Sequence, residues 1–353
     1  MFGVQPLGCG LKCKITYEIQ KNKLKLELLT LLRSGFLRVT GLEPEGGVPE
    51  MLDRYTYQSA LAASEAIHWR IEDIIGGDKR LDFTKSFMPE SLAHTAPLTF
   101  LTKDEKRILN QIRGNAYLCI FGLVEEFILP FILDHARPQL RGDDYRVRAL
   151  LQFAGEEAKH IQLFKRFRQD FEEGFGTKCE VIGPPEAIAA EILKHDPLGV
   201  AITTLHIEWM VQSHYVDSVR DDQDLDPQFK SLLKHHWVEE VQHAKLDTLM
   251  VEGLAASRSE EEILRGVEEY LEIGGFIDGG LQQQVEFDLQ SFEAASGRKL
   301  TEVEEGVFRR VQLRANRWTY LGTGMTHQKV LNTLGWLSLK ARKRVETVSP
   351  AFC

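Results

Sequence analysis

Residues 156–160, Glu-Glu-Ala-Lys-His, and residues 239–243, Glu-Glu-Val-Gln-His, are two copies of one pattern, Glu-Glu-x-x-His. Their histidines stand 83 positions apart, and so do two lone glutamates that precede them, Glu125 and Glu208. On a helix, the second glutamate of each copy and its histidine lie on one face, one turn apart. Two such pairs, with one glutamate from each of two further helices, are the ligands of a dinuclear metal site inside a four-helix bundle. The pattern therefore predicts an all-α fold built around metal.

The rest of the chain is also predicted to be helical. Apolar residues at helical spacing indicate four bundle helices, at about 102–136, 145–175, 200–220 and 229–256, which give a bundle core at about 104–256. Thr102 and Glu105 have the spacing of a capping box at the start of the first. Flanking helices are expected at 59–75 and 185–194, with C-terminal helices at about 260–346. We divide the chain into a poorly defined N-terminal extension, 1–50, and one helical domain, 51–353.

Composition excludes several classes of partner. The 353 residues carry a formal net charge of −9, and no basic stripe is available to neutralise phosphates, so nucleic acid is excluded. The longest apolar stretch, 116–133, is interrupted by two glutamates, which favours a buried bundle helix over a membrane span. The five cysteines are scattered and odd in number, as expected of reduced thiols in a cytoplasmic protein.

Five metal ligands follow from the repeat, namely Glu157, His160, Glu208, Glu240 and His243. A carboxylate on the apolar face of a helix is costly unless it is paired or bound to metal. The sixth ligand is either Glu125 or Glu126. The apolar face at the start of the helix is in phase with Glu126. The 83-residue repeat favours Glu125, as do the residues after it, because Asp134 then lies opposite the core, and we therefore favour Glu125. A bulged turn between Gly122 and Pro130 would reconcile both indications.

His236 extends the second motif to His-x-x-x-Glu-x-x-His, and its side chain shares the face of Glu240 and His243. The first copy has Phe153 at the corresponding position, so a third histidine would make the site asymmetric. Four neighbouring groups are expected outside the ligand set. Glu156 and Glu239 have no assigned role, Asp247 would orient the His243 imidazole, and His214 is expected at the surface.

The paired motif, over about 104–256, resembles the ferritin-like diiron carboxylate superfamily. Within it, the His-x-x-x-Glu-x-x-His variant at 236–243 looks like the p-aminobenzoate N-oxygenase family, as does the approach segment from Trp69 through Phe-Met-Pro-Glu-Ser-Leu at 87–92. Residues 1–50 have no counterpart there. The resemblance implies a ferritin-like bundle with two iron ions and the third histidine as a seventh ligand. The same donors accept manganese, so iron–manganese or manganese are alternatives. The resemblance also implies that dioxygen is activated to oxidise an aromatic amine.

The predicted function is that of a dioxygen-activating diiron oxygenase for a small organic substrate. Its pocket is expected beside the metals, near Phe121, Phe153 and Leu205. The alternatives are an iron-handling ferroxidase and an acyl-chain desaturase on the same bundle. No flavin or nicotinamide fingerprint is visible, so the electrons must come from an external donor. A second copy of the chain is a further candidate partner.

Overall fold

The computed structural model describes residues 55–353, and the predicted extension at 1–50 lies outside that range. Residues 55–353 contain no β-strand, only two isolated bridges, and the polypeptide is helical over most of this range. The predicted all-α class is therefore confirmed.

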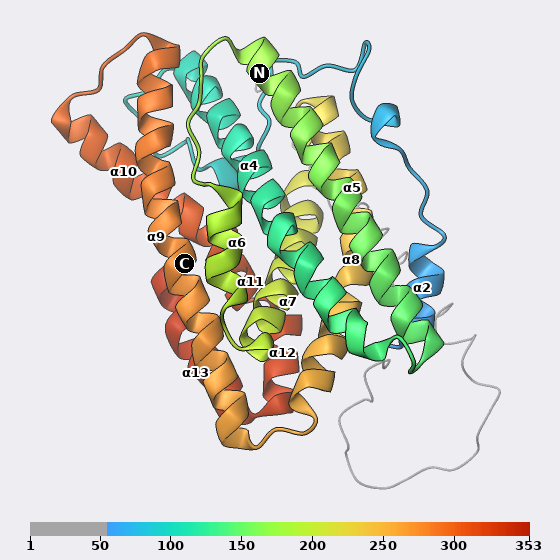
Figure 1. Cartoon of the computed structure of the whole chain (residues 1–353). Helices are drawn as coiled ribbons and strands as arrows, with labels where there is room; N and C mark the ends of the chain where they lie inside the picture. The colour runs from blue at the N-terminus through green and yellow to red at the C-terminus, as the bar shows by residue number, and fades with distance from the viewer. Residues whose placement is uncertain (1–54) are drawn as a thin grey trace, which may run out of the picture. The chain divides into compact units, whose positions relative to one another are not determined.

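Four long helices form the bundle (Figure 1): α4 (Lys103–Ala136), α5 (Asp144–Phe175), α7 (Pro197–Ser213) and α8 (Pro227–Ala255). Helix α4 packs along α5, and α7 packs along α8. The predicted capping box opens α4, with the Thr102 hydroxyl accepting from the Glu105 amide and the Glu105 carboxylate accepting from the Thr102 amide. Helix α8 opens with Pro227 after Asp226, whose carboxylate accepts from the Phe229 amide at 2.6 Å.

Further helices surround the bundle. They are α2 (Tyr57–Ser64), η1 (Ile71–Asp73), α3 (Glu90–Ala93), η2 (Arg137–Gln139) and α6 (Pro185–Leu193) before α7, and η3 (His214–Val219), a π-helical continuation of α7. After α8 come α9 (Glu260–Ser296), α10 (Glu302–Arg317), the π-helical η4 (Trp318–Gly322), α11 (Thr323–Met325), α12 (Gln328–Leu337), α13 (Leu339–Val348) and η5 (Ser349–Phe352). Helix α9 contacts both α4 and α7, and so covers one side of the bundle.

The helix expected at 59–75 is shorter than its pattern suggested, because α2 ends at Ser64. Further along, the backbone at Arg70 is extended. The Trp69 ring stacks near the His160 imidazole, with a centroid separation of 6.2 Å, and the Lys159 ammonium lies 3.8 Å from its centre. Contacts between the Trp69 ring and α5 thus outweigh local helical propensity in this segment.

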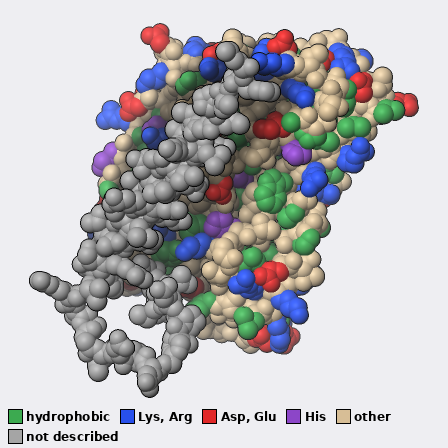
Figure 2. All heavy atoms as spheres, turned by 180° about the vertical axis from the view of Figure 1, so that it is seen from behind, with side chains coloured by type: hydrophobic (Ala, Val, Ile, Leu, Met, Phe, Trp, Pro, Cys, Tyr) green, Lys and Arg blue, Asp and Glu red, His purple; other side chains and the backbone are tan. Residues whose placement is uncertain are grey.

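Helix α4 is long and apolar enough to cross a membrane by length and composition, with a mean hydropathy of 2.0 in its best window. Within the fold, 72% of that window is buried, as expected for the core helix of a bundle. On the face shown in Figure 2, acidic and basic side chains are interspersed outside the region drawn in grey.

Candidate metal centre

Seven of the eight predicted ligands converge inside the bundle. Helix α5 contributes Glu157 and His160, α8 contributes His236, Glu240 and His243, α4 contributes Glu125, and α7 contributes Glu208. Each of the seven is at most 3% exposed. The two Glu-x-x-His motifs therefore place their side chains in one buried region, as their helical spacing predicts.

The converging side chains form two overlapping groups in which one ligand atom from each member lies within 4.8 Å of the others. The first contains Glu125, His160, His236 and Glu240, and the second contains Glu157, His160, Glu240 and His243. His160 and Glu240 belong to both. Each group has the oxygen and imidazole donors that iron and manganese accept, so the pair of groups can hold two metal ions side by side.

Glu240 faces both groups with different oxygens. Its Oε1 atom lies 2.8 Å from Nε2 of His236 and 3.0 Å from Nδ1 of His160, in the first group. Its Oε2 atom lies 2.8 Å from Nδ1 of His243, in the second. A carboxylate placed in this way can bridge two cations.

Several buried atoms of the cluster lack hydrogen-bond partners, which is the observation that tests whether a metal would fit. Within residues 55–353, no hydrogen bond satisfies Oε2 of Glu125, Oε2 of Glu157 or Oε2 of Glu208. Nδ1 of His160 and Oε1 of Glu240 are close to each other, yet they too lack hydrogen bonds of acceptable geometry. Buried polar atoms are seldom left unsatisfied. Lone pairs that converge without pairing are what metal ligands present, so the residues fit a dinuclear centre.

Glu208 stands at the edge of the cluster and belongs to neither group of four. Burial, together with the negative charge of Glu240, raises the pKa of the Glu208 carboxyl well above its usual value. Burial opposes ionisation of His160 as well, but the surrounding carboxylates outweigh it and raise the pKa of that imidazole. Without metal, the cluster therefore holds protons that binding of cations would release. Four glutamates would balance the charge of two divalent ions.

The structure separates Glu125 from Glu126. Glu125 is buried, and its Oε1 atom lies 3.1 Å from Nε2 of His236, whereas the Glu126 carboxylate lies 3.4 Å from the Lys165 ammonium, with its side chain 26% exposed. The bulged turn that would have reconciled the two indications is absent, because α4 is a regular α-helix between Gly122 and Pro130. Within residues 55–353, π-helical turns lie instead in η3, which continues α7 beyond Glu208, and in η4.

Glu156 and Glu239 have a role that the sequence analysis missed. The Oε2 atom of Glu156 lies 2.9 Å from Nε2 of His243, and the Oε2 atom of Glu239 lies 2.8 Å from Nε2 of His160. The first glutamate of each motif thus reaches the histidine of the other motif. Each histidine then keeps its proton on Nε2 and directs Nδ1 toward the cluster. The doubling of glutamate in both motifs was the signal for this arrangement.

Two expectations about neighbouring residues were wrong. Asp247 does not orient His243, because Glu156 occupies Nε2 of that imidazole, and burial raises the pKa of the Asp247 carboxyl well above its usual value. His214 is 3% exposed and not at the surface. Helix α11 packs against α7, and the Thr323 hydroxyl lies 3.2 Å from Nε2 of His214.

Neither a protein-family model nor a curated protein matches the sequence. Several solved structures resemble the fold, all described as R2-like ligand-binding oxidases. One mutant with an Mn/Fe cofactor is 16% identical, with 76% of this chain and 98% of that chain covered and a TM-score of 0.45. Another, with an Fe/Fe cofactor, is 16% identical over 79% and 98% of the two chains, with a TM-score of 0.43. Similarity at this level assigns no function, so the metal centre rests on its own geometry.

Proposed function

We propose that this protein is an oxidoreductase that uses two metal ions, iron with iron or iron with manganese, to activate dioxygen and oxidise a small organic substrate. The observation that carries the proposal is the pair of buried groups that share His160 and Glu240. Metals held there would supply electrons to dioxygen in a site closed to bulk water.

The protein side chains have separate tasks in this proposal. Glu240 bridges the two groups, Glu157 and Glu125 complete one group each, and Glu208 offers a further carboxylate beside them. Glu156 and Glu239 hold the two motif histidines in the tautomer whose Nδ1 atom is free to bind metal.

The finer proposal is N-oxygenation of an aromatic amine. It is supported by His236, the third histidine, whose Nε2 atom lies between carboxylates of Glu125 and Glu240. In the first step, the amine, dioxygen, two electrons and two protons give the hydroxylamine and one water. The two electrons come from an external donor, such as a reductase or a diffusible reductant.

The test is oxygen uptake by the full-length protein, loaded anaerobically with ferrous iron and then mixed with oxygen, ascorbate as reductant and 4-pentylaniline. We expect oxygen consumption and formation of the hydroxylamine in the native protein and in Glu126→Gln, and loss of both in Glu157→Gln. Oxygen uptake without an organic product would favour a ferroxidase. Equal activity in the Glu157→Gln variant would overturn the assignment of this site.

A further inference from the structure

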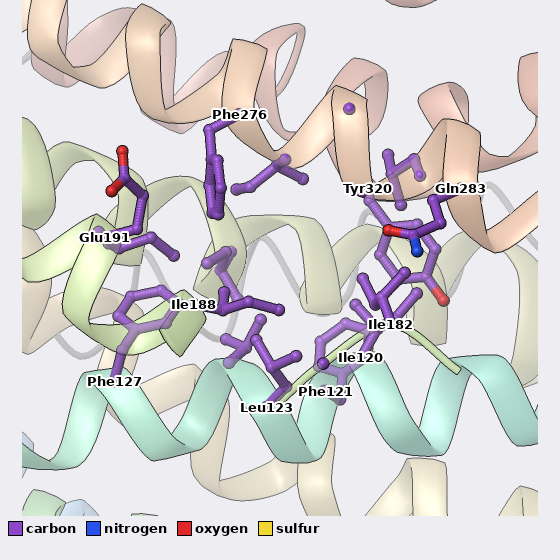
Figure 3. A pocket seen from close by; sticks show the side chains of 18 of the residues that line it. Ile120, Phe121, Leu123, Phe127, Ile182, Ile188, Glu191, Phe276, Gln283 and Tyr320 are labelled. Atoms are coloured by element: carbon purple, nitrogen blue, oxygen red, sulfur yellow. The ribbon is translucent and has the colours of Figure 1, made fainter. Parts of the chain in front are cut away.

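A largely apolar cavity of about 500 Å³ lies between α4, α6, α7 and α9 (Figure 3). Its floor is formed by buried residues of α4 and α7, and partly exposed residues of α6 and α9 border it. Phe276 borders the cavity, and its side chain is 39% exposed. Small-molecule sites are typically concave, apolar and of this size.

The floor of the cavity is close to the metal centre. Phe121 lines the cavity, and its ring centroid lies 5.8 Å from that of His236. Val124 and Ile207, also in the lining, directly precede Glu125 and Glu208 in the chain. Of the three residues expected to border a substrate pocket, Phe121 does so. Phe153 stacks on His243 instead, with ring centroids 4.0 Å apart, and Leu205 is buried in the core.

Charge is nearly absent from the lining. Glu191 is the one charged residue among the described residues that line the cavity, and the Lys194 ammonium, 2.5 Å from its carboxylate, offsets its charge. The lining contains no lysine, arginine or histidine within residues 55–353. The Tyr320 hydroxyl and the Gln283 amide supply hydrogen-bonding groups at one end (Figure 3). A ligand carboxylate or sulfonate would find no cationic side chain in the lining, and burying an unpaired charge is costly.

We propose that this cavity is the substrate site and that it selects uncharged, hydrocarbon-rich molecules, with neutral arylamines as the class that also suits the chemistry. Arylamines that carry a carboxylate are rejected. That the bound molecule is the substrate rests on the proposed function. That the cavity binds neutral and not anionic molecules rests on the lining alone.

Two consecutive glycines of α9 keep the cavity open. A Cβ atom at Gly280 would lie 3.4 Å from Cδ1 of Ile182, which lines the cavity too, and a Cβ atom at Gly279 would meet no protein atom within 4 Å. Glycine is disfavoured inside helices, so two in succession in a long helix need a reason. The space they leave free provides one.

The experiment uses the metal-free full-length protein and two fluorescent arylamines that differ by one charged group. N-phenyl-1-naphthylamine is neutral, and 8-anilinonaphthalene-1-sulfonate is its anionic counterpart. We expect saturable fluorescence enhancement with the neutral probe and affinity weaker by about tenfold or more for the sulfonate. Equal or tighter binding of the sulfonate would overturn the proposal.

Variants locate the binding. Gly280→Leu should weaken binding of the neutral probe by about tenfold or more, because its side chain occupies the cavity. Gly275→Leu is the matched control: it is the same change on the same helix, outside the lining, where a Cβ meets nothing within 4 Å. Ile188→Trp narrows the cavity from α6 and gives a second measurement if Gly280→Leu folds poorly. Gly275→Leu should leave binding unchanged, and unchanged binding in folded Gly280→Leu and Ile188→Trp would refute the assignment.

Gln283→Arg tests the charge rule directly, since it adds a cation to the lining. It should raise affinity for the sulfonate probe while leaving that for the neutral probe nearly unchanged. In the iron-loaded native protein, 4-pentylaniline should react and 4-(4-aminophenyl)butyrate should not. Selective binding of the neutral probe without any oxygen chemistry would overturn the proposed function but not the cavity assignment. Oxygen chemistry without probe selectivity would overturn the cavity assignment but not the proposed function.

Discussion

Replacing Glu156 with glutamine should weaken metal binding although Glu156 is not a metal ligand. One of its oxygens lies 2.9 Å from Nε2 of His243, and the other accepts from the Ser64 hydroxyl at 2.5 Å and the Gln152 amide at 2.9 Å. A carboxylate satisfies all three partners because every one of them is a donor. An amide cannot satisfy them all, because only its oxygen accepts from the Gln152 amide or from the imidazole N–H.

Either orientation of the new amide impairs the site. If its oxygen stays with Ser64 and Gln152, its NH₂ group faces His243 and shifts the imidazole proton to Nδ1, the atom that should bind metal. If its oxygen accepts from His243, the negative charge that strengthened that bond is still lost. Loss of such an outer partner typically lowers metal affinity by about 10- to 100-fold, which corresponds to about 1.4 to 2.7 kcal/mol.

The assay is competition between the protein and a chelating indicator for ferrous and manganous ions under anaerobic conditions. Glu239→Gln should behave in the same way through His160, from which Glu239 Oε2 lies 2.8 Å away. Glu126→Gln is the control, since it makes the same chemical change at a glutamate outside the cluster. Affinities within about twofold of the native value for both Glu156→Gln and Glu239→Gln would refute the cross-motif arrangement.

Three further predictions concern single positions. Glu125→Gln should weaken the binding of one of the two metal ions, while the adjacent Glu126→Gln should leave metal titrations unchanged. The opposite result would make Glu126 the ligand. Burial lowers the pKa of His214 to about 3, against about 6.5 in the unfolded chain. Between about pH 6.5 and about pH 3, His214 is protonated in the unfolded chain but not in the folded one. The free energy of unfolding should therefore fall as the pH drops from about 6.5 to about 3, by up to about 5 kcal/mol. In the metal-free protein, the free energy of unfolding, measured with denaturant at several pH values, should depend less steeply on pH for His214→Gln. An unchanged pH dependence would contradict the argument. A Cβ atom at Gly324 would lie 2.2 Å from the His206 ring, so Gly324→Ala should destabilise the fold by about 1 to 3 kcal/mol, whereas Gly275→Ala should not, and equal melting temperatures would contradict this packing.

The repeated motif was sufficient to predict the bundle and most of the centre. Glu157, His160, Glu240 and His243 have helical spacing that leaves one geometric outcome once their helices face each other. Thr102 with Glu105 likewise marked the start of α4, because capping is a local interaction. These features depend on residues within one or two helical turns of each other, so they can be predicted from the sequence.

Features that depend on contacts between distant segments were left open or missed. The choice between Glu125 and Glu126 depends on the rotation of α4 against α5 and α8, so the sequence favoured Glu125 without deciding it. The pairing of Glu156 with His243 joins residues 87 positions apart. Similarly, His214 was judged from the face of α7 alone, although the elements that cover its other side come from residues after 300.

The most direct test of the central claim is an anaerobic titration of the metal-free protein with ferrous iron, followed by metal analysis of the native chain and of Glu240→Ala. Because Glu240 belongs to both groups of converging ligands, we predict two tightly bound ions per native chain and the loss of tight binding at both sites in the variant. One ion or none in the native chain, or two ions retained without Glu240, would contradict a dinuclear centre bridged by this carboxylate.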